Sequence, residues 1–223
     1  HVPLHDFVVH DEIITKQQLL NKLIEAIKID GIKWNYLLFP SVTEGSNAQL
    51  QLDYEAYSLG IKSIIDDSYS IDLLSTYEET ISHLPGNFRR NIARLERKAL
   101  GQGGLELFQM KLNTPQGADF LELFIDIEND SWKGKNNSSI RSNQQYINYY
   151  QSLMDNFSSD SYSLINFLKQ NNELIAGQFA IYHKNRLNLL KIGYRESYSA
   201  IGPGNILLSY TLRDCIDNLD CIN

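Results

Sequence analysis

Cysteine is scarce in this chain, whose 223 residues include only Cys215 and Cys221, both near the C-terminal end. Two cysteines cannot build the disulfide framework that stabilises small secreted domains, so we expect a reducing compartment and a cytoplasmic location. Histidine is also scarce, and its 5 residues are scattered without the paired spacing of metal ligands. The sequence therefore predicts no metal site.

Long apolar runs are absent as well, since none approaches the roughly 20 residues that a membrane-spanning helix needs. The chain has no Gly-x-Ser-x-Gly segment and no Walker loop, which argues against the hydrolases and nucleoside triphosphatases that depend on them. No initiator Met or signal-peptide pattern precedes His1, and an apolar segment begins at Cys221. We therefore expect the native protein to extend upstream of His1 and beyond Asn223.

The chain is acidic, with a formal net charge of −7, but the charge is unevenly distributed. Residues 1–80 hold 5 basic and 13 acidic residues, whereas residues 81–103 hold 5 basic residues and 1 acidic residue. The acidic balance argues against broad electrostatic binding of nucleic acid. The basic segment predicts an amphipathic helix with a solvated cationic face, and the alternative is a face that contacts phosphate groups. Its basic residues are Arg89, Arg90, Arg94, Arg97 and Lys98, opposite Phe88, Ile92, Leu95 and Ala99.

Apolar periodicity divides the chain into three parts. Residues 1–75 alternate strand-like and helix-like segments and predict a partial N-terminal α/β lobe. Residues 76–104 predict a basic helical connector that ends in a glycine-rich stretch, and residues 105–223 predict a second domain. The predicted fold class is α/β, with a mixed sheet covered by helices on both faces.

The second domain opens with a strand and two helices. The strand is predicted from Leu105 to Lys111, where apolar residues alternate. The first helix is predicted to be capped by Thr114, with Pro115 at its first position. The second is predicted to start at a capping box made by Ser142 and Gln145.

A three-strand meander is predicted to follow. Its strands are expected at 162–168, 174–183 and 187–194. Asn171-Asn172 and Lys184-Asn185 separate them, and connections this short require antiparallel pairing. A last helix is predicted to begin near Asn205. Its expected buried face consists of Leu208, Leu212, Cys215 and Leu219.

A glycine-containing loop from Ser199 to Asn205 joins the meander to the last helix. Gly202 and Gly204 lack a Cβ and let the backbone approach a ligand. The first turn of the helix offers N–H groups without internal partners, at the positive end of the helix dipole. A phosphate or pyrophosphate is therefore the expected ligand, although a Gly-x-Gly taken alone is also typical of a plain tight turn.

This order of elements, with the loop Ser199-Ala200-Ile201-Gly202-Pro203-Gly204, resembles the GCN5-related N-acetyltransferase (GNAT) superfamily. The superfamily loop reads Gln/Arg-x-x-Gly-x-Gly/Ala, and Ser199 replaces its long polar residue. Within the superfamily, the chain looks most like a bacterial acetyltransferase-like branch found with cellulose and exopolysaccharide biosynthesis. The segments that carry this likeness are Ser131-Trp132-Lys133-Gly134, Gly193-Tyr194 and Gly202-Pro203-Gly204. Arg195 and Gly202 depart from the Asp and Ser that branch members commonly have there.

The resemblance implies a ligand and its position. The pantetheine arm of acetyl-CoA, or of another acyl-CoA, pairs with the strand before the loop in GNAT folds, and its pyrophosphate binds the loop. The implied cofactor-binding residues are Leu190, Ile192, Ser199, Ile201, Gly202, Gly204, Asn205 and Ile206. Gly193 predicts a bulge in that strand, which would open a gap for the thioester.

Two residues are the candidates for catalysis. Tyr194 is a candidate acid for the leaving thiolate, with Tyr198 as a second tyrosine beside the loop. Trp132 is interpreted either as a wall of the acceptor site or as a residue that closes the core. Lys133 is interpreted as solvated, with a cation for an acidic or sugar substrate as the alternative. Glu128 and Asp130 are also interpreted as solvated, with deprotonation of an amine through water as the alternative.

The predicted function is therefore that of an acyl-CoA-dependent N-acyltransferase acting on a small-molecule or glycan amine. An amino sugar of an envelope polysaccharide is the acceptor that the branch suggests. The branch is related to the Fem-type peptidyltransferases, so one alternative is an aminoacyl or peptidyl transferase that uses aminoacyl-tRNA. The acidic residues 1–80 argue against that partner. The other alternative is a degenerate GNAT lobe without catalytic activity, which the departure at Ser199 leaves open.

Overall fold

The structure, a computed structural model, describes residues 70–155 and 161–218, together with positions 22, 25, 26 and 29. The chain divides into two compact units, His1–Tyr69 and Ser70–Asn223. The lobe predicted for residues 1–75 therefore lies almost wholly outside the described residues. Within the described part of the chain, no helix is long and apolar enough to cross a membrane.

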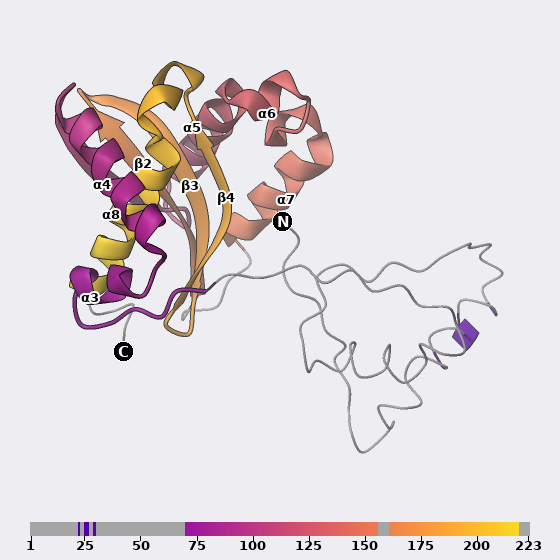
Figure 1. The fold of residues 1–223 in the computed structure, drawn as a ribbon. Helices are drawn as coiled ribbons and strands as arrows, with labels where there is room; N and C mark the ends of the chain where they lie inside the picture. Colours follow the sequence, from indigo (N-terminus) through magenta and orange to yellow (C-terminus); the bar gives the residue numbers. More distant parts are fainter. Residues whose placement is uncertain (1–21, 23–24, 27–28, 30–69, 156–160, 219–223) are drawn as a thin grey trace. The chain divides into compact units, whose positions relative to one another are not determined.

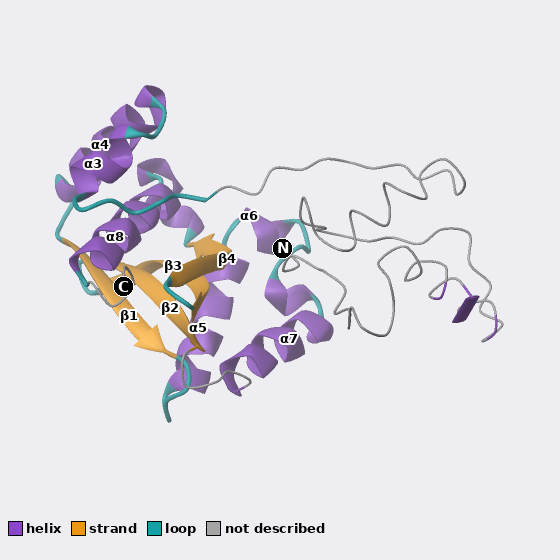
Figure 2. Cartoon of the chain, turned by 90° about the horizontal axis from the view of Figure 1, so that it is seen from below, coloured by secondary structure: helices purple, strands orange, loops and turns teal. Residues whose placement is uncertain are grey.

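The second unit is built on a four-stranded sheet in the order β1-β2-β3-β4 (Figures 1 and 2). Its strands are β1 (Leu105–Lys111), β2 (Ser161–Gln170), β3 (Glu173–His183) and β4 (Arg186–Tyr194). Each strand pairs antiparallel with the next, so the predicted meander is confirmed, and every pair of described strands is antiparallel.

The two meander turns have the backbone conformation that their residue types favour. Asn171 and Asn172 have φ of 50° and 68°, and Lys184 and Asn185 have φ of 47° and 58°. Two consecutive residues with positive φ form a type I′ turn, the mirror image of the common type I turn. Its twist matches the twist of antiparallel strands. Asparagine tolerates this region better than most residues, which is why these turns were readable from the sequence.

Helices cover both faces of the sheet (Figures 1 and 2). The helices are α3 (Tyr77–Ser82), α4 (Gly86–Leu100), α5 (Gly117–Asp130), α6 (Trp132–Lys135), α7 (Gln144–Asp155) and α8 (Pro203–Asp217), with 3₁₀ turns η1 (Ile140–Ser142) and η2 (Glu196–Ile201). On one face, Phe124 of α5 packs in a buried cluster with Phe167 and Phe179 of the sheet. On the other face, Leu207 of α8 packs with Leu168 and Ala176. The predicted α/β fold class is thus confirmed.

Two predicted helix starts are wrong, although both helices exist. The Thr114 hydroxyl donates to the Lys111 carbonyl in a turn, and α5 begins three residues later at Gly117. A Cβ on Gly117 would lie 1.9 Å from the Leu112 carbonyl oxygen, so the chain enters the helix where only glycine fits. In the second helix, Asn143 accepts from the N–H of Gln145 at 2.9 Å, which makes it the cap in place of Ser142.

The start and the buried face of α8 also differ from the prediction. The helix begins at Pro203 and not near Asn205, because proline at the first turn loses no helical hydrogen bond. Leu208 is only half-buried, and Leu219 lies outside the described residues. The buried residues are Pro203, Ile206, Leu207, Ser209, Thr211, Leu212, Cys215 and Ile216. This face is wide because α8 packs on the sheet and on α4 together.

The basic helix α4 is a structural part of this unit. Its predicted amphipathic character is confirmed, since Ile92, Leu95 and Ala99 are buried while Arg89, Arg90, Arg94, Arg97 and Lys98 are exposed. Glu96 joins it to α8 by accepting from Arg213 at 2.9 and 3.1 Å and from the Ser209 hydroxyl at 2.6 Å. The Arg213 guanidinium also lies over the Tyr77 ring of α3, 4.1 Å from its centroid.

We expect Glu96→Gln to lower the free energy of unfolding by about 1–3 kcal/mol, because it weakens charge-assisted hydrogen bonds in a partly buried site. Urea denaturation would measure the change. Arg97→Gln, on the exposed side of the same helix, is the matched control and is expected to change stability by no more than about 0.5 kcal/mol. Equal effects of the two substitutions would contradict a role for Glu96 in holding α4 to α8.

Candidate functional site

Strand β4 forms one edge of the described sheet and directs alternate backbone groups outward. The N–H of Arg195 donates to the Ile175 carbonyl at 2.8 Å, and Ile192 lies opposite Gln178 in the β3–β4 register. Hydrogen-bonded pairs alternate with non-hydrogen-bonded pairs along antiparallel strands. The N–H and C=O groups of Ile192 and Tyr194 therefore point away from β3, toward the outer side of β4.

The predicted bulge in β4 exists, but not at Gly193. The register pairs Phe179 with Lys191 and Ala180 with Leu189, so Leu190 is the extra residue. Gly193 instead pairs regularly with a glycine of β3. A Cβ on Gly193 would lie 2.4 Å from the Glu128 Cα. The glycine thus allows the end of α5 to pack directly on β4. The alternation of apolar residues along a strand does not reveal this packing requirement.

The glycine-containing loop folds as the 3₁₀ turn η2 followed directly by α8. Gly202 has φ 63° and ψ 52° and precedes the helix, so the left-handed conformation is needed there. Three loop N–H groups are used internally: that of Gly202 donates to Ser199, and those of Asn205 and Ile206 donate to the Gly202 carbonyl. The N–H of Gly204 donates to no acceptor in the part of the chain that the structure describes.

The loop lies against the end of β4. A Cβ on Gly204 would be 3.3 Å from the Ile192 side chain and 3.9 Å from that of Tyr194, so three predicted site residues are brought together. The loop also touches the basic helix, because the Lys98 ammonium donates to the Ala200 carbonyl at 2.8 Å. The side chains of the other predicted cofactor residues differ in their exposure. Ile201 and Ile206 are buried in the core, Leu190 is half-buried, and Ser199 and Asn205 are exposed.

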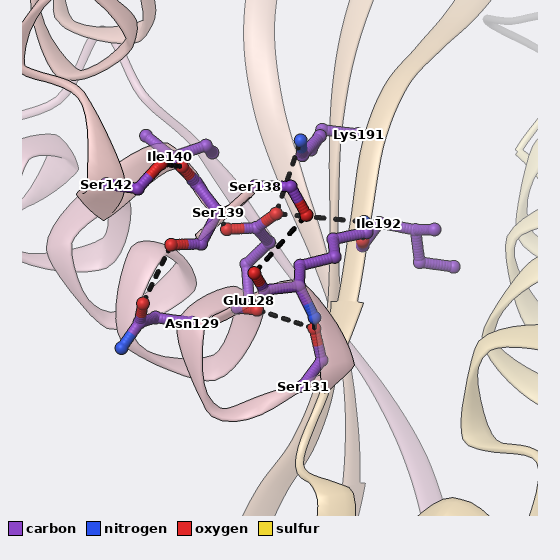
Figure 3. Close-up of polar contacts among 10 residues, drawn as sticks. Glu128, Asn129, Ser131, Ser138, Ser139, Ile140, Ser142, Lys191 and Ile192 are labelled. Atoms are coloured by element: carbon purple, nitrogen blue, oxygen red, sulfur yellow. Dashed lines mark hydrogen bonds and ion pairs between the residues drawn. The ribbon is translucent and has the colours of Figure 1, made fainter. Parts of the chain in front are cut away.

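A buried carboxylate lies on the opposite face of β4 from the loop. The Glu128 side chain has 0% of its surface exposed, and its Oε2 accepts from the Ile140 N–H at 2.9 Å. Its Oε1 lies 3.3 Å from the Lys191 ammonium and 3.7 Å from the Lys133 ammonium. Figure 3 shows Glu128 between Lys191 and the segment that carries Ser139 and Ile140. We refer to Glu128, Lys133 and Lys191 as the charged triad.

Lys133 links the charged triad to the edge of the sheet. Its ammonium donates to the Ile192 carbonyl, one of the outward-facing groups of β4. Burial lowers the pKa of Lys133, Glu128 opposes this shift, and Lys191 adds to it. The interpretation of Glu128 and Lys133 as solvated residues is therefore wrong.

Two hydrogen bonds of the Ser131 hydroxyl position Lys133 just after the end of α5. The Ser131 hydroxyl donates to the Glu128 carbonyl at 2.7 Å and accepts from the Lys133 N–H at 3.3 Å, which caps α6. Gly134 lets α6 fold back, since a Cβ there would lie 1.9 Å from the Asn129 carbonyl oxygen. The segment Ser131-Trp132-Lys133-Gly134 thus encodes a tight turn that presents Lys133 to β4.

The two candidate catalytic residues are not side by side on one face. Trp132 is 49% exposed, which excludes the interpretation that it closes the core. Tyr194 is half-buried and packs in the cluster on the α8 side of the sheet. Tyr198 donates to Glu173 at 2.8 Å, and that hydrogen bond raises the pKa of Tyr198. Asp130 lies 3.8 Å from the Arg195 guanidinium.

No group of three or more histidine, cysteine or acidic side chains is placed to hold a metal ion in the part of the chain that the structure describes. The charged triad itself has one carboxylate and two cations, a set that attracts anions or exchanges protons and does not ligate metal ions.

In the part of the chain that the structure describes, the edge strand β4 is followed by a glycine-containing loop and the start of a long helix. A family model described as an acetyltransferase (GNAT) domain matches residues 86–221, and the chain belongs to this family. The match begins at Gly86 and so includes α4. A comparison with curated proteins finds no match. The GNAT resemblance is therefore confirmed, and family membership supports acyl transfer as the activity.

Proposed function

We propose that the protein is an acyl-CoA-dependent N-acyltransferase, with acetyl-CoA as the first cofactor to consider. One observation carries the proposal: in a chain of the GNAT family, the outer edge of β4 leads through the turn η2 to a helix start where the Gly204 N–H donates to no described acceptor. The edge supplies the backbone groups that an extended amide chain needs. The helix start supplies an N–H group and a positive dipole for phosphate.

The proposed cofactor position follows the backbone. The pantetheine arm would pair with Tyr194 and with the N–H of Ile192 along β4, since the Ile192 carbonyl already accepts from Lys133. The pyrophosphate would meet Gly204 at the start of α8. Ser199 and Asn205 are exposed around that position. Ile201 and Ile206 would contribute through the backbone, because their side chains fill the core. The bulge at Leu190 would make room at the far end of the arm.

The proposed acceptor is an amine. Trp132 offers an exposed aromatic surface beside the charged triad, and sugars as well as amines commonly pack on such a surface. An amino sugar of a bacterial envelope polysaccharide, acylated in the cytoplasm, is the acceptor we propose to test first. Tyr194 lies beside Gly204, where the arm would begin, so we propose that it lines the cofactor path and that the thiolate takes its proton from the acceptor nitrogen.

Isothermal titration calorimetry with acetyl-CoA tests the cofactor. We expect binding at one site, with a dissociation constant between about 1 μM and 1 mM, the usual range for enzyme substrates. Titration with uncharged tRNA and with aminoacyl-tRNA belongs in the same series, because α4 carries an exposed cationic face. Binding of aminoacyl-tRNA without binding of acetyl-CoA would favour the Fem-type alternative. Binding of neither would favour a lobe without catalytic activity.

A further inference from the structure

We propose that the Lys133 amine accepts the proton from the acceptor amine during acyl transfer, and that Glu128 and Lys191 hold it in place for this role. The inference rests on the proposed function and assigns a task to the charged triad, which cofactor binding alone does not require. It makes Lys133 a catalytic residue and makes the other two members of the triad positioning residues.

The position of the triad along β4 supports this role. If the pyrophosphate binds at the loop, the pantetheine arm runs from Tyr194 back toward Leu190. A strand advances about 3.3 Å per residue, so these four steps cover about 13 Å. The acyl end of the arm then lies near Leu190 and Lys191, away from the phosphates. Lys191 is a β4 residue at that end, and Lys133 reaches the strand at the Ile192 carbonyl, midway along this path.

The charges of the triad favour an uncharged Lys133. Two ammonium groups share one fully buried carboxylate, which leaves one positive charge in a poorly solvated site. Glu128 Oε1 is closer to Lys191 than to Lys133, at 3.3 Å against 3.7 Å. The negative charge of Glu128 therefore compensates the positive charge of Lys191 more fully than that of Lys133. Lys133 is 16% exposed and is the group that loses its proton at least cost.

The surrounding charged groups do not supply a competing base. Tyr150 of α7 faces Glu128, and burial raises its pKa, so it stays protonated. Arg195 of the segment after β4 lies near Asp130 and Glu173, and Lys135 of α6 lies near Glu196. Each of these charges has an opposite charge within 4.0 Å. Lys133 is thus the group in this region that is poised to change its protonation state.

In the proposed step, the acceptor ammonium, R–NH₃⁺, gives one proton to the uncharged Lys133 amine and becomes R–NH₂. The amine nitrogen attacks the thioester carbonyl carbon, a C–N bond forms, and the C–S bond breaks as the thiolate leaves. The second nitrogen proton passes to the thiolate, giving the amide and free CoA. Lys133 then returns its proton to water.

The first test measures the protonation of Lys133 directly. The rate at which a trace of acetic anhydride modifies each lysine, followed by mass spectrometry across a pH series, gives the midpoint for Lys133. Lys191→Met removes a cation that lowers the pKa of Lys133, so the midpoint should move to higher pH. Glu128→Gln removes the anion that raises it, so the midpoint should move to lower pH. Shifts in opposite directions would show that Glu128 and Lys191 set the protonation of Lys133, and the second test asks whether catalysis uses it. A midpoint unchanged in both variants would overturn the inference.

The second test separates the inference from the proposed function. Thiol release from acetyl-CoA is followed with a panel of primary amines that includes D-glucosamine. Lys133→Met and Lys133→Arg are both expected to lose about 100-fold in kcat with little change in acetyl-CoA binding, the scale of general-base catalysis. Arginine keeps the positive donor to Ile192 but cannot accept a proton, so it distinguishes a base from a structural contact.

The outcomes of the second test are distinct. A wild-type chain that binds no acetyl-CoA, or that turns over none of the amines, contradicts the proposed function itself. A chain that turns over an amine, while Lys133→Arg retains activity within tenfold and keeps the same pH profile, contradicts only the role of Lys133.

Discussion

A Gly193→Ala variant is expected to lose about 3 kcal/mol of its free energy of unfolding. The new methyl group would lie 2.4 Å from the Glu128 Cα, a backbone atom that a rotamer change cannot move. Either α5 or β4 must shift, and overpacking of this kind costs about 1–3 kcal/mol and sometimes more. Chemical denaturation monitored by circular dichroism would give the value.

Gly104→Ala is the matched control for this substitution. A Cβ at Gly104 would meet no atom within 4 Å. Its effect is expected to stay within about 0.5 kcal/mol, or to be slightly stabilising because alanine restricts the unfolded chain. If Gly193→Ala changed the free energy of unfolding as little as Gly104→Ala, the close contact between α5 and β4 would be contradicted. The placement of Glu128 beside that strand would then lose its support.

A Gly204→Val variant is expected to bind acetyl-CoA more weakly by about 1–3 kcal/mol, the value of a hydrogen bond to a charged group. The added side chain would crowd Ile192, whose side chain already lies 3.3 Å from the position of a Cβ, and would cover the unused N–H. Strain is not the cause, because the positive φ of this loop belongs to Gly202. Calorimetry on the folded variant measures the loss.

Ser199→Ala is the control for the cofactor prediction. Ser199 is exposed, and the proposed contacts at this loop come from the backbone, so its loss should change acetyl-CoA affinity less than twofold. Wild-type affinity in a folded Gly204→Val chain would mean that the cofactor binds elsewhere. A large loss with Ser199→Ala would mean that a side chain, and not the helix start, holds the phosphates.

The strands and turns of the second unit were predictable because their signals are local. Alternating apolar residues predicted β1. The pairs Asn171-Asn172 and Lys184-Asn185 predicted the two turns of the meander. The helix starts were less predictable, since neighbouring residues compete for the same role. Thr114 and Ser142 have the right chemistry for caps, but close packing at Gly117 and the better placed Asn143 decide where the helices begin.

The glycine-containing loop was predictable as a motif but not in its details. The pattern of two glycines before a helix predicted where the backbone would be open. It did not predict which glycine takes the left-handed conformation, because that depends on the 3₁₀ turn before Gly202. Nor did it predict that the N–H groups of Asn205 and Ile206 would be used inside the loop, which leaves the N–H of Gly204.

The charged triad was not predictable from one sequence. Glu128 and Lys133 are five residues apart, a spacing that does not place them on one face of a continuous helix. They meet because Ser131 and Gly134 turn the chain between them. Lys191 joins them through the register of β4, which is displaced by the bulge at Leu190. A buried cluster that depends on a turn and a bulge together leaves no periodic signal.

The bond from Lys133 to the Ile192 carbonyl also bears on what can pair with the edge of the described sheet. An exposed edge strand presents unpaired backbone groups on which another chain can add a strand, the first step toward aggregation. Natural sheets block such edges with bulges and with lysine side chains. Strand β4 has both, with a bulge at Leu190 and an ammonium group on one of its outward carbonyls. The edge of the described sheet therefore carries two features that discourage a second protein strand from pairing with it.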